Sequence, residues 1–196
     1  MSSIASDSLV VVITGPESCG KSTLAQGLSQ EFGGQWVPEY AREYIEALNR
    51  AYEYEDVECI ARYQYDVFIR LMGGKKSLLF IDTYLIITKV WFTHVYNRFP
   101  TWLDEAIWSS KVDLFMLCRP DLPWVSDAVR ENGHLREYLF EQYKKELEHY
   151  GFNYVVVVGE GEDRISLAKE YVNQLLISKQ IPHDTTHISR RREKSH

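Results

Sequence analysis

The sequence lacks the features that mark membrane-spanning, secreted and zinc-stabilised proteins. Its longest apolar runs, residues 9–13 and 154–158, are too short to cross a bilayer. The three cysteines, Cys19, Cys59 and Cys118, are odd in number and widely spaced, which argues against a disulfide framework or a zinc site. The polar first eight residues do not resemble a secretory signal. We therefore expect a cytoplasmic protein with no membrane partner.

Basic charge is also scarce. The 196 residues carry 22 Lys and Arg against 28 Asp and Glu, a net charge of -6, so we expect no nucleic-acid partner. With 45% hydrophobic and 26% charged residues, the composition excludes a disordered or collagen-like chain. The length allows one domain, which we place at residues 1–181, followed by a polar tail at 182–196 that we expect to be disordered.

Short apolar runs alternate with longer amphipathic stretches along the chain. The predicted strands are residues 9–14, 35–38, 77–82, 112–118 and 152–158. The predicted helices are residues 21–32, 39–51, 56–72, 85–96, 102–109, 135–150 and 163–178. Strands that are apolar throughout belong to sheets covered on both faces. This order therefore predicts an α/β fold of three layers with a five-stranded parallel sheet.

The strongest motif is a phosphate-binding loop at residues 15–22, which read GPESCGKS and fit G-x-x-x-x-G-K-[ST] at every fixed position. Glycines let the backbone approach phosphate oxygens, and the N–H groups then form a nest at the start of the following helix. Lys21 would reach the β- and γ-phosphates of ATP, and the Ser22 hydroxyl would hold Mg²⁺. The predicted ATP-binding residues here are Gly15, Pro16, Glu17, Ser18, Cys19, Gly20, Lys21, Ser22 and Thr23.

A carboxylate ends the second buried strand. Asp82 comes directly after Leu78-Leu79-Phe80-Ile81 and fits a Walker B position, where it would hold Mg²⁺ directly or through water. The alternative is that Asp82 caps the helix predicted at residues 85–96. Together with the phosphate loop, the pattern favours the metal carboxylate.

The absence of other motifs narrows the class of phosphate-loop protein. The chain has no guanine-reading N-K-x-D and no D-x-x-G, so it does not match GTPases. Motor and AAA-type ATPases usually carry further subdomains. Small-molecule kinases remain, which add a polar acceptor site and a lid bearing arginines.

Residues 119–136 are the lid candidate, because they place arginines among prolines and acids after a predicted strand. Arg119, Arg130 and Arg136 are candidate contacts for the phosphates of ATP. The alternative is that these arginines lie on the surface and pair with Asp127 or Glu131.

Residues 38–44, which read PEYAREY, are the acceptor-site candidate. Glu39 could take the proton of an attacking hydroxyl, Tyr40 offers a flat face and Arg42 offers a fork of N–H donors. Clusters of this kind also occur as ordinary helix caps, so the capping alternative stays open.

Four segments in this order resemble the ribosylnicotinamide kinase domain of the NadR type, a nucleoside-kinase-like P-loop family. They read PESCGKSTL, VPEYAREYI, LLFIDTYLIITKVW and DLPWVSDAVRE, and the resemblance covers roughly residues 9–175. The resemblance implies a P-loop NTPase fold with a short lid. It also implies transfer of the ATP γ-phosphate to the ribose 5′-hydroxyl of nicotinamide riboside, giving nicotinamide mononucleotide.

The resemblance assigns roles by position. Lys21 and Ser22 hold phosphates and Mg²⁺, Glu39 and Asp82 are the acceptor-side and metal carboxylates, and Arg130 is the lid arginine. The implied catalytic residues are therefore Lys21, Glu39, Asp82 and Arg130. The implied substrate contacts are Glu39, Tyr40, Arg42, Asp82, Tyr84, Trp91, Trp124 and Asp127.

Two positions depart from the family pattern. The family often has D-T-D where this chain has Asp82-Thr83-Tyr84, and an aromatic residue where this chain has Pro38. An aromatic face suits the positively charged pyridinium of nicotinamide riboside. Trp36, Tyr84 and Trp91 are the candidates to supply it.

Several alternatives stay open at this point. The chain could phosphorylate another nucleoside or small hydroxyl metabolite, or it could be an ATP-binding switch or ATPase with a protein partner. A regulatory module whose basic tail contacts nucleic acid is a third possibility. Either Glu39 or Asp82 could be the catalytic base. No H-x-G-H nucleotidyltransferase signature is present, so we expect the reaction to stop at the mononucleotide.

Overall fold

The computed structural model describes residues 8–74, 77–124 and 133–180. The tail predicted at 182–196 lies outside these residues, as do Asp127, Arg130 and Glu131 of the lid candidate. Among the described helices, none combines the length and the apolar character that crossing a bilayer requires.

The centre of the fold is one five-stranded parallel sheet. Its strands are β1 (Leu9–Thr14), β2 (Gln35–Val37), β3 (Leu78–Asp82), β4 (Leu114–Cys118) and β5 (Tyr154–Val157), in the spatial order β2-β3-β1-β4-β5. In this register Ile13 of β1 lies beside Asp82 of β3, and Thr14 lies beside Leu117 of β4. The ends of these three strands therefore meet at one edge of the sheet, where the phosphate loop begins.

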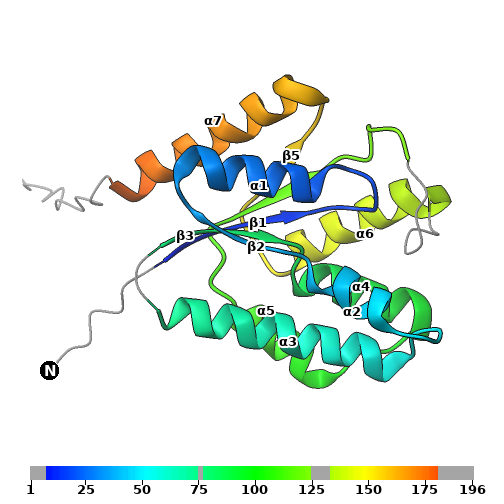
Figure 1. The fold of residues 1–196 in the computed structure, drawn as a ribbon. Coiled ribbons are helices and arrows are strands. Elements are labelled where there is room, and N and C mark those ends of the chain that lie inside the picture. The colour runs from blue at the N-terminus through cyan, green and yellow to red at the C-terminus, as the bar shows by residue number, and fades with distance from the viewer. Residues whose placement is uncertain (1–7, 75–76, 125–132, 181–196) are drawn as a thin grey trace, which may run out of the picture.

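Helices cover both faces of the sheet and complete three layers (Figure 1). On one face lie α1 (Lys21–Phe32) and α7 (Gly161–Gln180), packed over Val11, Ile13 and Met116. The other face is covered by α3 (Tyr54–Met72), α4 (Leu85–Tyr96), α5 (Thr101–Ser109) and α6 (Arg136–His149). The short α2 (Tyr40–Ala47) lies beside α3, and the 3-10 turn η1 (Gly133–Leu135) precedes α6. The predicted fold class is confirmed.

The largest difference from the predicted elements lies between α2 and α3. The helix predicted to end at residue 51 ends at Ala47, because Leu48 turns to an extended conformation. The next helix begins at Tyr54, where Glu53 and Asp56 form a reciprocal capping box. Residues 48–53 are therefore a loop, which we call the α2–α3 loop, and it borders the site described next.

Candidate active site

The phosphate loop joins β1 to α1 and depends on backbone conformations that favour glycine. Gly15 has a φ of 142° and Gly20 a φ of 77°. A Cβ atom on Gly15 would lie 2.6 Å from the carbonyl oxygen of Cys118, so β4 leaves no room for a side chain there. Lys21 Nζ donates a hydrogen bond to the carbonyl of Pro16 at 2.8 Å, which places the ammonium over the loop. The predicted phosphate loop therefore has the geometry its motif requires.

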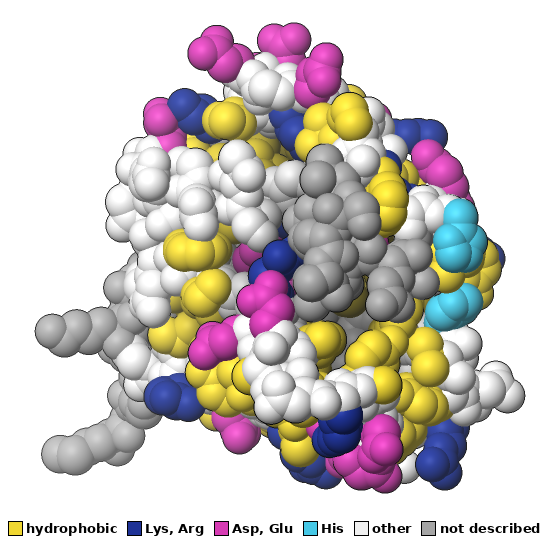
Figure 2. Space-filling view, turned by 45° about the vertical axis from the view of Figure 1, so that its right-hand side comes forward, with side chains coloured by type: hydrophobic (Ala, Val, Ile, Leu, Met, Phe, Trp, Pro, Cys, Tyr) yellow, Lys and Arg dark blue, Asp and Glu magenta, His cyan; other side chains and the backbone are white. Residues whose placement is uncertain are grey.

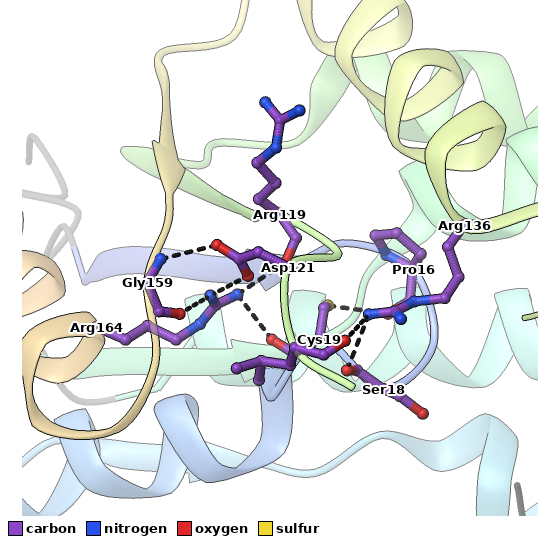
Figure 3. A network of polar contacts seen from close by, with 9 residues as sticks. Pro16, Ser18, Cys19, Arg119, Asp121, Arg136, Gly159 and Arg164 are labelled. Carbon is purple, nitrogen blue, oxygen red and sulfur yellow. Dashed lines mark hydrogen bonds and ion pairs between the residues drawn. The ribbon is translucent and has the colours of Figure 1, made fainter. Parts of the chain in front are cut away.

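Arg164, near the start of α7, donates hydrogen bonds to the backbone of the phosphate loop and of the segments beside it (Figure 3). Its side chain is buried, and its Nη2 donates to the carbonyl of Cys19 at 2.8 Å. Its Nη1 pairs with Asp121 at 2.7 Å and also donates to the carbonyl of Gly159. One guanidinium thus ties the phosphate loop to the segments after β4 and β5. Nothing in the sequence distinguishes this arginine from an ordinary helical one, and it was not predicted.

The predicted lid arginines have different positions in the structure. Arg136 is buried at the start of α6, where its Nη2 donates to the carbonyls of Ser18 and Leu122 at 3.2 and 2.9 Å. It therefore supports the loop backbone. The exposed side chain of Arg119 points away from this network, with its guanidinium 5.6 Å from the centre of the Phe140 ring (Figure 3). A contact between Arg119 and ATP stays a prediction.

Two cysteine thiols lie side by side beneath the loop. Cys19 and Cys118 are both fully buried, and Cys19 Sγ donates to the carbonyl of Pro16 at 2.9 Å. Burial raises the pKa of the Cys19 thiol, but the hydrogen bond from Cys118 and the charge of Lys21 outweigh it and lower that pKa. The charges of the arginines around it act in the same direction. The underside of the loop is therefore electropositive.

Two carboxylates lie near this loop. Asp82 ends β3 and is almost completely buried, and burial followed by the negative charge of Glu39 raises its pKa to about 6. The N-cap position of the helix that follows is Tyr84, so the capping alternative for Asp82 is wrong. Glu39 is the N-cap of α2, but its side chain makes no capping hydrogen bond with the described residues.

Asp82 and Ser22 fit a Mg²⁺ ion held together with phosphate oxygens. The Oδ2 atom of Asp82 is buried and has no hydrogen-bond partner among the described residues, while its carboxylate interacts with the Ser22 hydroxyl. Within those residues no group of three or more His, Cys, Asp or Glu could hold a metal. One carboxylate and one hydroxyl match the way Mg²⁺ is bound when a nucleotide supplies the remaining oxygens.

A cavity of about 670 Å³ runs from the phosphate loop to the α2–α3 loop and α4. Figure 2 shows this edge of the molecule, where acidic, basic and hydrophobic side chains gather. The cavity brings together the phosphate-loop residues other than Pro16 with Glu39, Arg42 and Trp91, all predicted for the site. The sequence reasoning missed other lining residues, among them Arg50, Tyr52, Gln64, Thr88 and Tyr143.

Three predicted aromatic contacts point elsewhere. Tyr84 is buried in the core, where its hydroxyl shares a hydrogen bond with Ser110 Oγ at 3.0 Å and its ring packs on Phe68. The face of Tyr40 is covered by Tyr63, with ring centres 3.7 Å apart. Trp36 packs among the side chains between the sheet and α1. The structure therefore corrects Tyr84 as a substrate contact, whereas Tyr40 as a contact stays a prediction. Of the three stacking candidates, Trp91 lines the cavity.

The described part of the lid candidate touches the phosphate loop. Trp124 is 40% exposed, and its Nε1 donates to Glu17 Oε2 at 3.3 Å. This contact places Trp124 at the phosphate end, whereas a position near the riboside was predicted. The predicted roles of Asp127 and Arg130 lie outside the described residues.

Comparisons with known proteins agree with this geometry. A family model described as an AAA domain matches residues 10–164. The trifunctional NAD biosynthesis/regulator protein NadR of Salmonella typhimurium is 32% identical over 129 residues, which cover 63% of this chain and 31% of NadR. NadR of Escherichia coli matches with the same identity and coverage. The match thus spans about a third of the length of these curated relatives.

Solved structures give the same result. A NadR protein in complex with NR superposes with a TM-score of 0.74 and 26% identity, covering 86% of this chain and 51% of that chain. Deoxyadenosine kinase from M. mycoides superposes with a TM-score of 0.62 over 85% of this chain. Its 15% identity bears on the fold alone. The resemblance to NadR that the sequence motifs indicated is confirmed.

Proposed function

The chain belongs to the AAA domain family, and from this premise we propose that it is an ATP-dependent kinase acting on nicotinamide riboside. The reaction transfers the γ-phosphate of ATP to the ribose 5′-hydroxyl and yields nicotinamide mononucleotide. One observation carries the proposal: a single cavity has the phosphate loop at one end, Glu39 along its wall and Trp91 on α4. Such a cavity can hold a nucleoside in line with a triphosphate.

The phosphate loop binds and orients the donor. Its backbone N–H groups and Lys21 Nζ surround the β- and γ-phosphates once Lys21 exchanges the Pro16 carbonyl for phosphate oxygens. Arg164 and Arg136 hold the loop carbonyls, so the loop keeps its shape as negative charge develops. Ser22 and Asp82 would hold Mg²⁺, which would supply positive charge beside the phosphates.

Glu39 is the better candidate for the base. It lines the cavity, and its carboxylate makes no capping bond with the described residues, so it is free to accept the proton of the 5′-hydroxyl. Asp82 is almost completely buried at the end of β3 and suits the metal role. This division assigns one role to each carboxylate.

Trp91 is the candidate to bind the pyridinium ring. It is the aromatic residue of the predicted set that lines the cavity, and Tyr52 lies next to it with ring centres 6.5 Å apart. A cationic ring over an indole face gains cation–π attraction. The NadR protein of similar fold was solved with NR, which supports this choice of acceptor.

A coupled ADP-release assay over a panel of nucleosides tests the proposal. We expect nicotinamide riboside to give the highest kcat/KM, and Glu39→Gln to lower kcat by about 100-fold or more because proton removal fails. Glu43→Gln is the matched control, since Glu43 lies exposed on the same helix. ADP release that no nucleoside accelerates would overturn the proposal and indicate an ATPase or switch instead. Turnover of another nucleoside with none of nicotinamide riboside would reject the acceptor.

A further inference from the structure

Arg50 lies on the α2–α3 loop and lines the cavity that we assign to the riboside. The sequence motifs did not predict a function for Arg50. The cavity wall around it also includes Ala51, Tyr52 and Trp91. A fixed guanidinium in the same cavity as an aromatic face bears on which acceptor the site prefers.

The guanidinium is held in one orientation although the side chain is 52% exposed. Its Nη1 donates to Asp56 Oδ2 at 2.6 Å and its Nη2 to Asp56 Oδ1 at 2.9 Å. Asp56 is buried and is itself fixed, because it accepts from the backbone N–H of Glu53 at 2.7 Å and from the Tyr44 hydroxyl at 3.0 Å. The pair is therefore anchored to the first turn of α3.

Two donors of Arg50 remain after these contacts. An arginine has five N–H groups. Nη1 uses one for Asp56 and one for the carbonyl of Ala51 at 2.9 Å, and Nη2 uses one for Asp56. The second Nη2–H and the Nε–H have no partner among residues 8–74, 77–124 and 133–180. These two groups share one edge of the planar guanidinium and point in parallel, which matches the two oxygens of a carboxylate.

The charges nearby favour the same ligand. Asp56 balances the charge of Arg50, and Glu46, an acid of the cavity wall, pairs with Arg42 at 3.5 Å. Glu39, also on that wall, is the acid that we assign to the 5′-hydroxyl. A pyridinium ring with a neutral amide brings an uncompensated positive charge toward Arg50. A pyridinium ring with a carboxylate brings an acceptor group and no net charge, so it suits the free edge better.

We propose that Arg50 binds a carboxylate on the pyridine ring of the acceptor, so that the enzyme phosphorylates nicotinic acid riboside as well as nicotinamide riboside. This inference rests on the proposed function and names the substrate class of the same site. Arg50 acts on recognition of the ring and does not touch the transferred phosphate.

The test measures kcat/KM for both ribosides with Mg²⁺ and ATP, in the wild type and in Arg50→Gln. We expect the wild type to use the carboxylate riboside at least as well as the amide. We expect Arg50→Gln to lower kcat/KM for the carboxylate riboside by about 10- to 100-fold, the size of one charge-assisted bidentate contact. The amide riboside should change by less than about threefold, and its turnover also reports that the variant is folded.

Arg62→Gln is the control, because Arg62 is an exposed arginine of α3 that pairs with Glu58 outside the cavity. Equal losses on both ribosides in Arg50→Gln would overturn the inference. So would a wild type that turns over the amide riboside and leaves the carboxylate riboside unused, and in that case the proposed function stands. If neither riboside is phosphorylated, the proposed function fails and this inference fails with it.

Discussion

The phosphate end and the acceptor end of the cavity are built in different ways. At the phosphate end, one contiguous loop provides the ligand-binding N–H groups from its own backbone. Buried Arg136 and Arg164 donate hydrogen bonds to carbonyls of that loop. At the acceptor end, side chains arrive from α2, the α2–α3 loop, α3 and α4, and Arg42 and Arg50 are partly exposed. The first construction fixes a ligand common to many enzymes. At the acceptor end, each side chain can be substituted without altering the others, so we expect this end to determine which acceptor is used.

The largest effect is expected from Asp82→Asn, which removes the carboxylate at the end of β3 that we assign to Mg²⁺. Without a charged partner for Mg²⁺ at this position, kcat should fall by about 100-fold or more. Steady-state kinetics with saturating ATP measure the loss. Full activity in the variant would mean that another residue holds the metal.

The same substitution should change stability in the opposite direction. In the folded protein the pKa of Asp82 is raised to about 6. Protonated Asp82 therefore stabilises the folded state, fully so below the pKa of the unfolded chain. That stabilisation is lost as the pH rises through 6. Asparagine stays neutral, so without nucleotide or divalent metal the variant should be more stable by about 2–3 kcal/mol at pH 7.5. The difference should shrink toward pH 4. Thermal unfolding of both proteins between pH 4 and 7.5, in buffer with a chelator, measures this difference in stability. A stabilisation of the variant that grows as the pH falls would contradict the expected pH dependence.

The next effect tests how firmly the phosphate end is held. Arg164→Gln removes two Nη donors and leaves Asp121 without its ion pair, so the free energy of unfolding should fall by about 3 kcal/mol. The KM for ATP should rise as the loop loosens. Lys169→Gln on the same helix is the control, since its ion pair with Glu31 is exposed and should be worth little. Denaturant unfolding gives the free energy of unfolding of both variants. Equal losses would show that Arg164 stabilises the protein no more than an exposed ion pair does.

A smaller effect should separate the two ends. Trp91→Leu keeps apolar volume but removes the indole face, so the KM for nicotinamide riboside should rise by about tenfold. The KM for ATP should stay as in the wild type, because Trp91 lies on α4, away from the phosphate loop. Initial rates with each substrate varied in turn make the measurement. A rise in both KM values would mean that the helix has moved.

The smallest effect checks the correction at Tyr84. Tyr84→Phe removes the hydroxyl that bonds to Ser110, so stability should fall by about 1 kcal/mol. The KM for the riboside should not change, because the ring packs in the core against Phe68. A raised KM would return Tyr84 to the substrate contacts.

The phosphate end of the cavity could be predicted from the sequence better than the acceptor end. The phosphate loop and the strands were predictable because the information is local: a contiguous motif and uninterrupted apolar runs ending at Thr14 and Asp82. The supports of the loop were not, because Arg164 lies 145 residues from its partner Cys19. At the acceptor end, Glu39 and Trp91 could be proposed from motif order. The positions of Tyr40 and Tyr84 depended on packing against Tyr63 and Phe68, which only the fold reveals.

The α2–α3 loop illustrates the limit most clearly. The helical pattern predicts a helix through Ala51, yet the capping box of Glu53 and Asp56 starts a new helix and leaves residues 48–53 as a loop. Arg50 then turns to the cavity and binds Asp56. The residue proposed to select the acceptor therefore owes its position to a helix boundary, which is among the least predictable features of a sequence.

We propose that the two ends of one cavity bring a triphosphate and a pyridine riboside together for phosphoryl transfer. Phosphorus NMR of the products formed from ATP, Mg²⁺ and nicotinamide riboside tests it most directly. We expect equal amounts of ADP and a phosphomonoester whose phosphorus couples to the two 5′ protons of the ribose. Inorganic phosphate and ADP alone, with the riboside unchanged, would contradict it.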